Sequence, residues 1–240
     1  TPTGLSASDA TDGAGFGNAV AVNGLSAIIG GNGFNSNAGS AYIFTREVGV
    51  WAEQATLHTL LGAGVPAANA EFGASVSIAA NLAVVGAPFS TVGTTNEAGL
   101  AYVFERKKTS WSLLRTLEQT NPTPPHVSMP VAGDHFGSAV AIDRGLSHIL
   151  VGDIDESTMG TSSGAFMHFI LRKDLGTPCG TNVECASDLC VDGVCCNSAC
   201  GGGIDSDCQA CAATKGNTLA DGTCGPASNT TMCHKAATLC

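Results

Sequence analysis

The chain has few charged residues, and few of these are basic. Charged residues make up 12% of the 240, with 10 Lys and Arg against 20 Asp and Glu, so the formal net charge is −10. A surface with this balance repels phosphate backbones, so nucleic acid is not an expected partner. The one basic cluster, Arg106-Lys107-Lys108, falls between two expected strands, and we interpret it as a solvated hairpin tip.

Long apolar runs and helical periodicity are also missing. No stretch approaches the roughly 18 consecutive apolar residues of a membrane-spanning helix, so no membrane span is expected in this segment. No glycine-free window repeats with the helical period of about 3.6 residues. The chain starts without Met and without a signal peptide, and we take it to be a processed segment of a secreted precursor.

Cysteine is absent from residues 1–178. All 11 cysteines follow, and this break in composition predicts a domain boundary. Cysteines at such density indicate an oxidising, extracellular compartment, where disulfides replace an adequate apolar core. We expect disulfides among Cys179, Cys185, Cys190, Cys195, Cys196, Cys200, Cys208, Cys211, Cys224, Cys233 and Cys240.

Two questions about these cysteines stay open at the level of sequence. Their number is odd, so at least one thiol is free, pairs with another chain, or has its partner beyond Cys240. A zinc site is the alternative for Cys208 and Cys211 with Cys195 and Cys196 upstream, because thiolates are zinc ligands. Disulfides are the preferred interpretation for a secreted tail.

Glycine is abundant, with 31 residues, and much of it recurs in three copies of one pattern. Each copy opens with Phe-Gly, at Phe16-Gly17, Phe72-Gly73 and Phe136-Gly137, so the copies start 56 and then 64 residues apart. Short apolar strands follow in each copy. In the first copy, Ala19–Val22 and Ala27–Ile29 are joined by Asn23-Gly24, which is a strong signal for a two-residue hairpin turn.

Each copy has room for four consecutive antiparallel strands, which is the anatomy of a propeller blade. We therefore predict an all-β fold with three four-stranded antiparallel blades, followed by a small, loop-rich disulfide domain. The predicted boundaries are residues 1–57, 58–117 and 118–174 for the blades and 175–240 for the cysteine-rich domain. Three blades cannot close a propeller, which needs about four to eight, so open strand edges are expected.

The motif in the second copy resembles the FG-GAP repeat, which builds the β-propeller of integrin α-subunits and of other surface proteins. This copy combines Phe72-Gly73 with Gly86-Ala87-Pro88. The other copies keep the first glycine of the tripeptide, at Gly30 and Gly152, and change the two residues after it. The resemblance covers residues 1 to about 174, and it implies β-propeller blades in an extracellular protein.

The copies depart from integrin-like repeats in one respect. The calcium loop resembling Asp-x-Asp-x-Asp-Gly, which such repeats often carry between their first two strands, is missing from all three. Without several oxygen ligands there, neither a metal nor another cofactor is expected. Asp153, Asp155 and Glu156 lie close together in a different loop, which we interpret as a solvated acidic turn, with an accidental metal site as the alternative.

The tail has a looser resemblance of its own. Residues 185–196 resemble small cysteine-rich modules of surface proteins, loosely EGF-like or disintegrin-like. No Arg-Gly-Asp is present, so a disintegrin-style integrin ligand is not implied. Asn229 begins the usable N-glycosylation sequon Asn229-Thr230-Thr231, and it is expected in a secreted loop.

No residue pattern in the chain predicts catalysis. Residues 160–164 read Gly-x-Ser-x-Gly, but a hydrolase nucleophile needs this motif between a parallel strand and a helix, and here it joins antiparallel strands. The six histidines show no metal-ligand spacing: His58, His126, His135, His148, His168 and His234. His135, which precedes a Phe-Gly pair, is predicted to lie on the surface. We therefore expect no enzyme.

The leading hypothesis is an extracellular structural or adhesive surface protein, with the repeating protomer of a filament as its more specific form. Its partners would be other copies of itself or other surface proteins and glycans, and an inter-chain disulfide is one candidate link. The alternative is a glycan- or protein-binding propeller module of a larger receptor-like protein. A secreted hydrolase would need catalytic residues outside this segment.

Overall fold

The computed structural model describes residues 4–62, 66–119, 130–143, 148–157, 161–171, 176–179, 185, 189–191, 193–197, 209–210 and 225–226. The chain divides into two compact units, residues 1–169 and residues 170–240. Within the described residues, no helix is long and apolar enough to cross a membrane.

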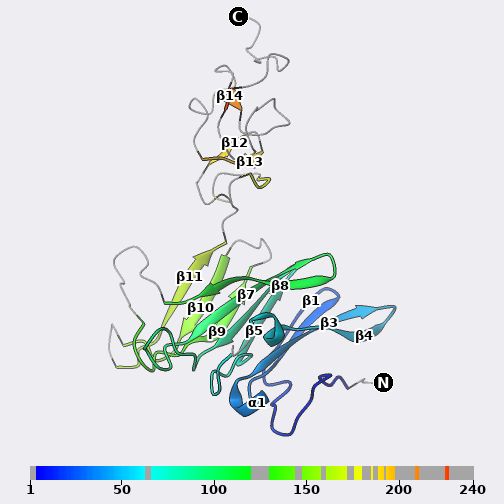
Figure 1. The fold of residues 1–240 in the computed structure, drawn as a ribbon, viewed down its shortest axis with the longest axis vertical. Coiled ribbons are helices and arrows are strands. Elements are labelled where there is room, and N and C mark those ends of the chain that lie inside the picture. Colours follow the sequence, from blue (N-terminus) through cyan, green and yellow to red (C-terminus); the bar gives the residue numbers. More distant parts are fainter. Residues whose placement is uncertain are drawn as a thin grey trace, which may run out of the picture. The chain divides into compact units, whose positions relative to one another are not determined.

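The described residues of the first unit form three antiparallel sheets, one for each copy of the repeat (Figure 1). Blades 1 and 2 have four strands each, in sequential order. Blade 1 consists of β1 (Val20–Asn23), β2 (Ser26–Gly31), β3 (Ser40–Glu47) and β4 (Val50–Thr56). Blade 2 consists of β5 (Ser75–Ala79), β6 (Leu82–Ala87), β7 (Leu100–Lys107) and β8 (Ser110–Leu117). The all-β prediction is confirmed.

Blade 3 has three strands in the part of the chain that the structure describes. They are β9 (Phe136–Ile142), β10 (His148–Asp153) and β11 (Ala165–Ile170), with β10 in the middle. The fourth strand predicted for this blade would follow β11, and residues 172–175 lie outside the described residues.

Turn chemistry explains the local structure between the strands. The β1–β2 hairpin turns at Gly24-Leu25, because Asn23 pairs with Ser26, so the turn lies one residue later than predicted. Gly24 has φ +59°, which glycine adopts without a side-chain clash. The segment α1 (Phe34–Asn37) contains left-handed residues, so it is a turn, and η1 (Leu57–Leu60) is a short 3₁₀ helix.

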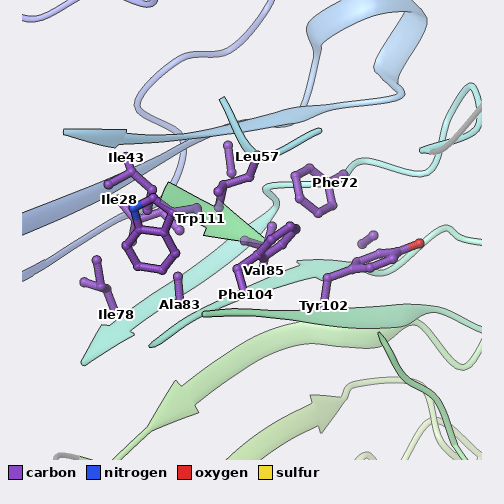
Figure 2. Packing of buried hydrophobic residues seen from close by; sticks show 12 residues of the cluster. Ile28, Ile43, Leu57, Phe72, Ile78, Ala83, Val85, Tyr102, Phe104 and Trp111 are labelled. Atoms are coloured by element: carbon purple, nitrogen blue, oxygen red, sulfur yellow. The ribbon is translucent and has the colours of Figure 1, made fainter. Parts of the chain in front are cut away.

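The largest core cluster lies between blades 1 and 2 (Figure 2). Ile28 and Ile43 of blade 1 are fully buried against a blade 2 set that includes Phe72, Val85 and Phe104. Burying an aliphatic or aromatic side chain of this size contributes about 2 kcal/mol. The apolar side chains of one blade therefore stabilise the next, and each sheet depends on its neighbour.

The second unit contains only short two-stranded pairs in the described residues. One is the hairpin of β12 (Cys190–Val191) and β13 (Val194–Cys195), and the other joins β14 (Gln209–Ala210) to β15 (Gly225–Pro226). Strands of two residues bury little apolar surface, so covalent links take the place of a core here.

Candidate functional site

The two Phe-Gly pairs that begin blades 2 and 3 form the junctions between successive blades. The amide N of Phe72 donates to the carbonyl O of Ala38 at 3.0 Å, and Phe136 makes the same bond to Ala98 at 3.0 Å. Parallel bridges pair Gly39 with Phe72 and Gly99 with Phe136. The motif therefore joins the entry of each new blade to the third strand of the previous one.

The repeated glycines are required because two backbones approach closely at each junction. A Cβ on Gly86 would lie 1.9 Å from the carbonyl O of Gly137, and one on Gly30 would lie 2.0 Å from that of Gly73. Gly73 and Gly137 also have φ of +94° and +96°, a region that side chains disfavour. Ala87 and Pro88, the rest of the tripeptide in blade 2, are both buried.

The aromatic ring of each Phe-Gly pair packs on the third strand of its own blade. Phe72 is fully buried, and its ring meets those of Tyr102 and Phe104 edge-on, with centroids 5.4 and 6.1 Å apart. Offset and edge-on pairs of this kind contribute about 1 kcal/mol beyond their buried area. Related edge-on contacts occur at Phe16 with Tyr42 and Phe44, and at Phe136 with Phe169.

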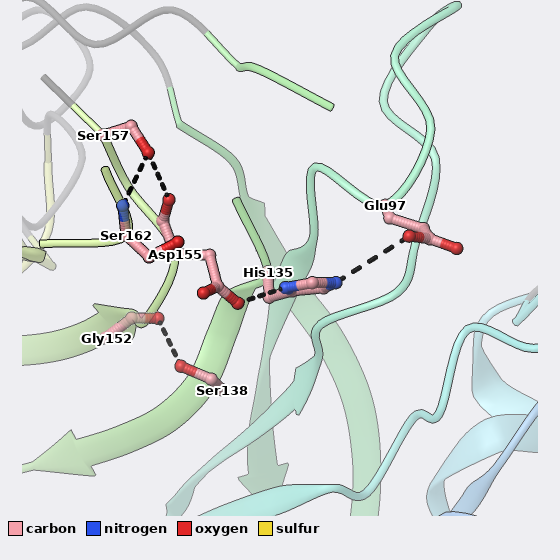
Figure 3. A network of polar contacts seen from close by, with 7 residues as sticks. All are labelled: Glu97, His135, Ser138, Gly152, Asp155, Ser157 and Ser162. Carbon is pink, nitrogen blue, oxygen red and sulfur yellow. Dashed lines mark hydrogen bonds and ion pairs between the residues drawn. The ribbon is translucent and has the colours of Figure 1, made fainter. Parts of the chain in front are cut away.

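A polar network occupies the loop end of the junction between blades 2 and 3 (Figure 3). His135, just before the Phe-Gly pair, has its Nδ1 2.8 Å from Oδ2 of Asp155 and its Nε2 3.8 Å from Oε2 of Glu97. Its ring also packs on Phe89, with centroids 4.6 Å apart. Only 18% of the side chain is exposed, so the prediction of a surface histidine was wrong: its neighbours on both blades cover it.

Comparison with known families agrees with this junction geometry. Residues 3–44 and 51–104 match the FG-GAP repeat family. The matched residues span most of blades 1 and 2. The match confirms the predicted resemblance over these residues, and blade 3, which lies beyond it, makes the same backbone junction through Phe136. No curated protein matches the chain.

The acidic loop of blade 3 differs from its counterparts in blades 1 and 2. Where blade 2 has Ala70 and Ala87, blade 3 has Asp134 and Asp153, and these carboxylates are 3% and 1% exposed. Glu156 is also buried, at 5%. The interpretation of this loop as a solvated turn was therefore wrong, because Asp153 and Glu156 turn into the blade.

Burial changes the chemistry of Asp153. It raises the pKa of this carboxyl to about 7, and the neighbouring charges of Asp134 and Glu156 contribute to the rise. The buried amide of Gln119 donates to Asp153 Oδ2. Oδ1 of Asp153 and Oε1 of Gln119 are buried without a hydrogen-bond partner. The buried carboxyl group of Asp153 therefore holds a proton more readily than an exposed aspartate does.

The basic cluster does not behave as one solvated hairpin tip. Lys107 and Lys108 are exposed at the β7–β8 turn. Arg106 instead bridges two blades, because its guanidinium donates to Ser26 Oγ of blade 1 at 3.1 Å and lies over the Trp111 ring at 5.5 Å. No local sequence pattern signals this difference, since it depends on the neighbouring blade.

Two disulfides are interleaved at the start of the second unit. Cys179 bonds Cys190, and Cys185 bonds Cys195. Cys190 and Cys195 face each other across the β12–β13 hairpin, yet each bonds a cysteine that precedes the hairpin. Cys196 is disulfide-bonded as well. The predicted disulfide character of the tail is therefore confirmed for these five cysteines.

The described cysteines leave no thiolate for zinc. The sulfurs of Cys179, Cys185 and Cys195 lie within 4.8 Å of one another, but all three are in disulfides. Cys195 and Cys196, named above as zinc ligands, are also oxidised, so half of that ligand set is lost. The other half lies outside the described residues, with Asn229 and the remaining cysteines: Cys200, Cys208, Cys211, Cys224, Cys233 and Cys240.

The remaining candidates for catalysis are dispersed. Ser162 of the Gly-x-Ser-x-Gly segment lies in an exposed loop between two antiparallel strands, and its amide donates to Ser157 Oγ at 3.0 Å. His58 lies 2.6 Å from Ser40 Oγ, and burial lowers the pKa of its imidazole. His148 and His168 stack at 4.9 Å, while His126 and His234 lie outside the described residues.

Proposed function

We propose that this chain is an extracellular, non-catalytic adhesive protein that binds surface proteins or glycans through the loop end of its blades. The presence of FG-GAP blades and a disulfide-bonded cysteine unit in one chain carries the proposal. FG-GAP repeats suggest adhesion or ligand binding, and disulfides are typical of extracellular proteins.

The loop end offers chemistry suited to such a partner. In each antiparallel blade, the β2–β3-type loop and the entry through Phe-Gly lie at the same end, opposite the hairpin turns. At the junction of blades 2 and 3, Glu97 and Asp155 keep side-chain exposures of 59% and 36% beside His135. Partly exposed acids held by a rigid scaffold suit hydrogen-bonding to a sugar or to a basic protein surface.

A binding assay with one charge-reversed variant tests the proposal. The 240-residue chain is immobilised and probed with arrays of glycans and extracellular protein domains. We expect a saturable ligand whose binding is lost in Glu97→Lys. The matched control is Glu47→Lys, an exposed glutamate at the opposite end of blade 1, which should bind as the wild type does. Absence of any saturable ligand, or equal loss in both variants, would contradict a loop-end site.

The second candidate function is the protomer of an extracellular filament. The observation that favours it is the exposure of large apolar side chains on the first and last of the described blades, at Val20 and Val22 of blade 1 and at Leu150 and Phe166 of blade 3. Filaments visible by negative-stain electron microscopy of the purified chain would support it. A uniform population of single particles or closed dimers would count against it, without bearing on adhesion at the loop end.

A further inference from the structure

Equivalent positions in the three blades differ sharply in exposure on the face that each blade turns toward the next. Two residues before the first glycine of the tripeptide stand Ile28, Val84 and Leu150. Ile28 and Val84 are fully buried, whereas Leu150 is 43% exposed. Blade 2 covers Ile28, and blade 3 contacts the strand that carries Val84. No described residue covers Leu150 in the same way.

The third strand repeats this contrast. Ala41 and Ala101 are fully buried at the blade 1–2 and blade 2–3 junctions, and the equivalent residue of blade 3, Phe166, is 69% exposed. We call Leu150, Gly152, Gly164 and Phe166 the trailing face of blade 3. His148 and His168, which lie two residues from Leu150 and Phe166 along the same strands, share this face and are also exposed. A following blade covers the equivalent positions of blades 1 and 2.

Blade 1 has exposed apolar residues on its first strand, at the other end of the row of blades. Val20 and Val22 of its first strand are 69% and 67% exposed. Their equivalents in blade 2 are Val76, which packs against the core, and Ile78, which is 6% exposed because blade 1 covers it. Gly17, Val20 and Val22 form what we call the leading edge of blade 1.

The glycine contacts that join successive blades are unused at both of these surfaces. A Cβ on Gly86 would lie 1.9 Å from the carbonyl O of Gly137 in the next blade. A Cβ on the equivalent Gly152 would meet only its own blade, with Ala139 Cβ nearest at 3.2 Å. Gly17 keeps the φ of +99° that this junction requires, yet a Cβ there would have nothing within 4 Å.

A second glycine of the trailing face gives the same result. A Cβ on Gly99 would lie 2.0 Å from the carbonyl O of Phe136 in the next blade. The equivalent Gly164 also has a positive φ, of +70°, but its nearest neighbour would be the carbonyl O of Ile154 in its own loop, at 3.3 Å. The backbone of blade 3 is thus shaped for a Phe-Gly pair that no described residue supplies.

We propose that the trailing face of blade 3 binds the leading edge of blade 1 in a second copy of this chain. The two surfaces correspond in position to the two halves of a junction that occurs twice within the unit. Phe166 in place of alanine adds apolar area, which helps a contact between separate chains to offset the lost freedom of association. Such a contact is heterologous, so it forms a closed ring or an open chain.

Sedimentation velocity over a range of concentrations tests this contact. We expect the wild-type chain to self-associate, with or without reductant. The leading-edge variant Val20→Lys with Val22→Lys and the trailing-face variant Gly152→Ala should each associate roughly tenfold or more weakly. Val50→Lys is the matched control, because Val50 is a valine of the same 69% exposure at a hairpin tip, and it should behave as the wild type does.

Mixing the two interface variants gives the decisive result. The leading-edge variant keeps an intact trailing face, and Gly152→Ala keeps an intact leading edge, so an equimolar mixture should form one-to-one pairs that neither forms alone. Circular dichroism of each variant confirms that it is folded. A wild-type chain that stays monomeric, association that disappears only on reduction, or a mixture that forms no pairs would overturn the proposal. None of these outcomes bears on ligand binding at the loop end.

Discussion

At the scale of single residues, Asp153 is the least ordinary group in the blades. It occupies a position that is glycine in blade 1 and alanine in blade 2, and it is 1% exposed. Its neighbours Asp134 and Glu156 are also acidic, so burial and like charge both favour its protonated form and raise its pKa to about 7. The free energy that is needed to bury this carboxyl group therefore depends on pH.

The raised pKa of Asp153 leads us to predict how the free energy of unfolding changes with pH. Between about pH 4 and pH 7 the folded chain keeps the proton of Asp153 while the unfolded chain has lost it, so the free energy of unfolding falls as pH rises through this range. Asp153→Asn removes the titration. At pH 8 it should stabilise the first unit by up to ~4 kcal/mol, from about 1.4 kcal/mol for each pH unit between 3.8 and 7.

Urea denaturation at about pH 4.5 and pH 8 measures the effect. The two proteins should differ little at the lower pH and most at the higher one. Asp12→Asn, which changes an exposed aspartate in blade 1, is the control and should leave the pH dependence intact. An Asp153→Asn variant with the wild-type pH dependence would show that another group governs it.

At the scale of elements, the spacing between sheets is set by backbone rather than by side chains. Gly86 contacts the carbonyl O of Gly137, and the hydroxyl of Ser75 donates to the same oxygen at 2.8 Å. A blade that shifted outward to admit a methyl group would also loosen the apolar contacts on that face. The backbone contact at the junction and the apolar packing between the two blades therefore depend on each other.

Gly86→Ala tests this coupling. The added Cβ would lie 1.9 Å from one backbone oxygen and 2.3 Å from Ser75 Oγ, so we expect a loss of about 3 kcal/mol in the free energy of unfolding. Gly152→Ala is the matched control at the same position of blade 3, where only Ala139 Cβ at 3.2 Å must yield. Its loss should stay below about 1 kcal/mol. Trp111 fluorescence in urea reports both, and equal losses would refute a junction-specific role.

At the scale of the whole molecule, two units are stabilised by different means. The first has no cysteine and depends on apolar contact between blades, while the second has interleaved disulfides and strands of two residues. A small unit that depends on disulfides loses most of its stability when they are reduced.

Reduction of the disulfides should therefore destabilise the second unit and leave the first unit folded. We expect dithiothreitol to leave the calorimetric transition of residues 1–169 unchanged and to abolish amide protection in the β12–β13 hairpin. Hydrogen exchange with mass spectrometry assigns each effect to its unit. A first-unit transition that moves to lower temperature on reduction would contradict this division of stability.

The amino-acid sequence was enough to predict the repeat, the all-β class and the disulfide character of the cysteine-rich tail. These features follow from local requirements: glycine at positive φ, phenylalanine at each blade entry, and apolar residues in short strands. Which faces are covered is a property of the folded arrangement, since Ile28 and Leu150 look alike in sequence and differ only in whether a neighbouring blade covers them. The burial of Asp153, the bridging by Arg106 and the choice of disulfide partners also depend on contacts between distant residues, which no local pattern encodes.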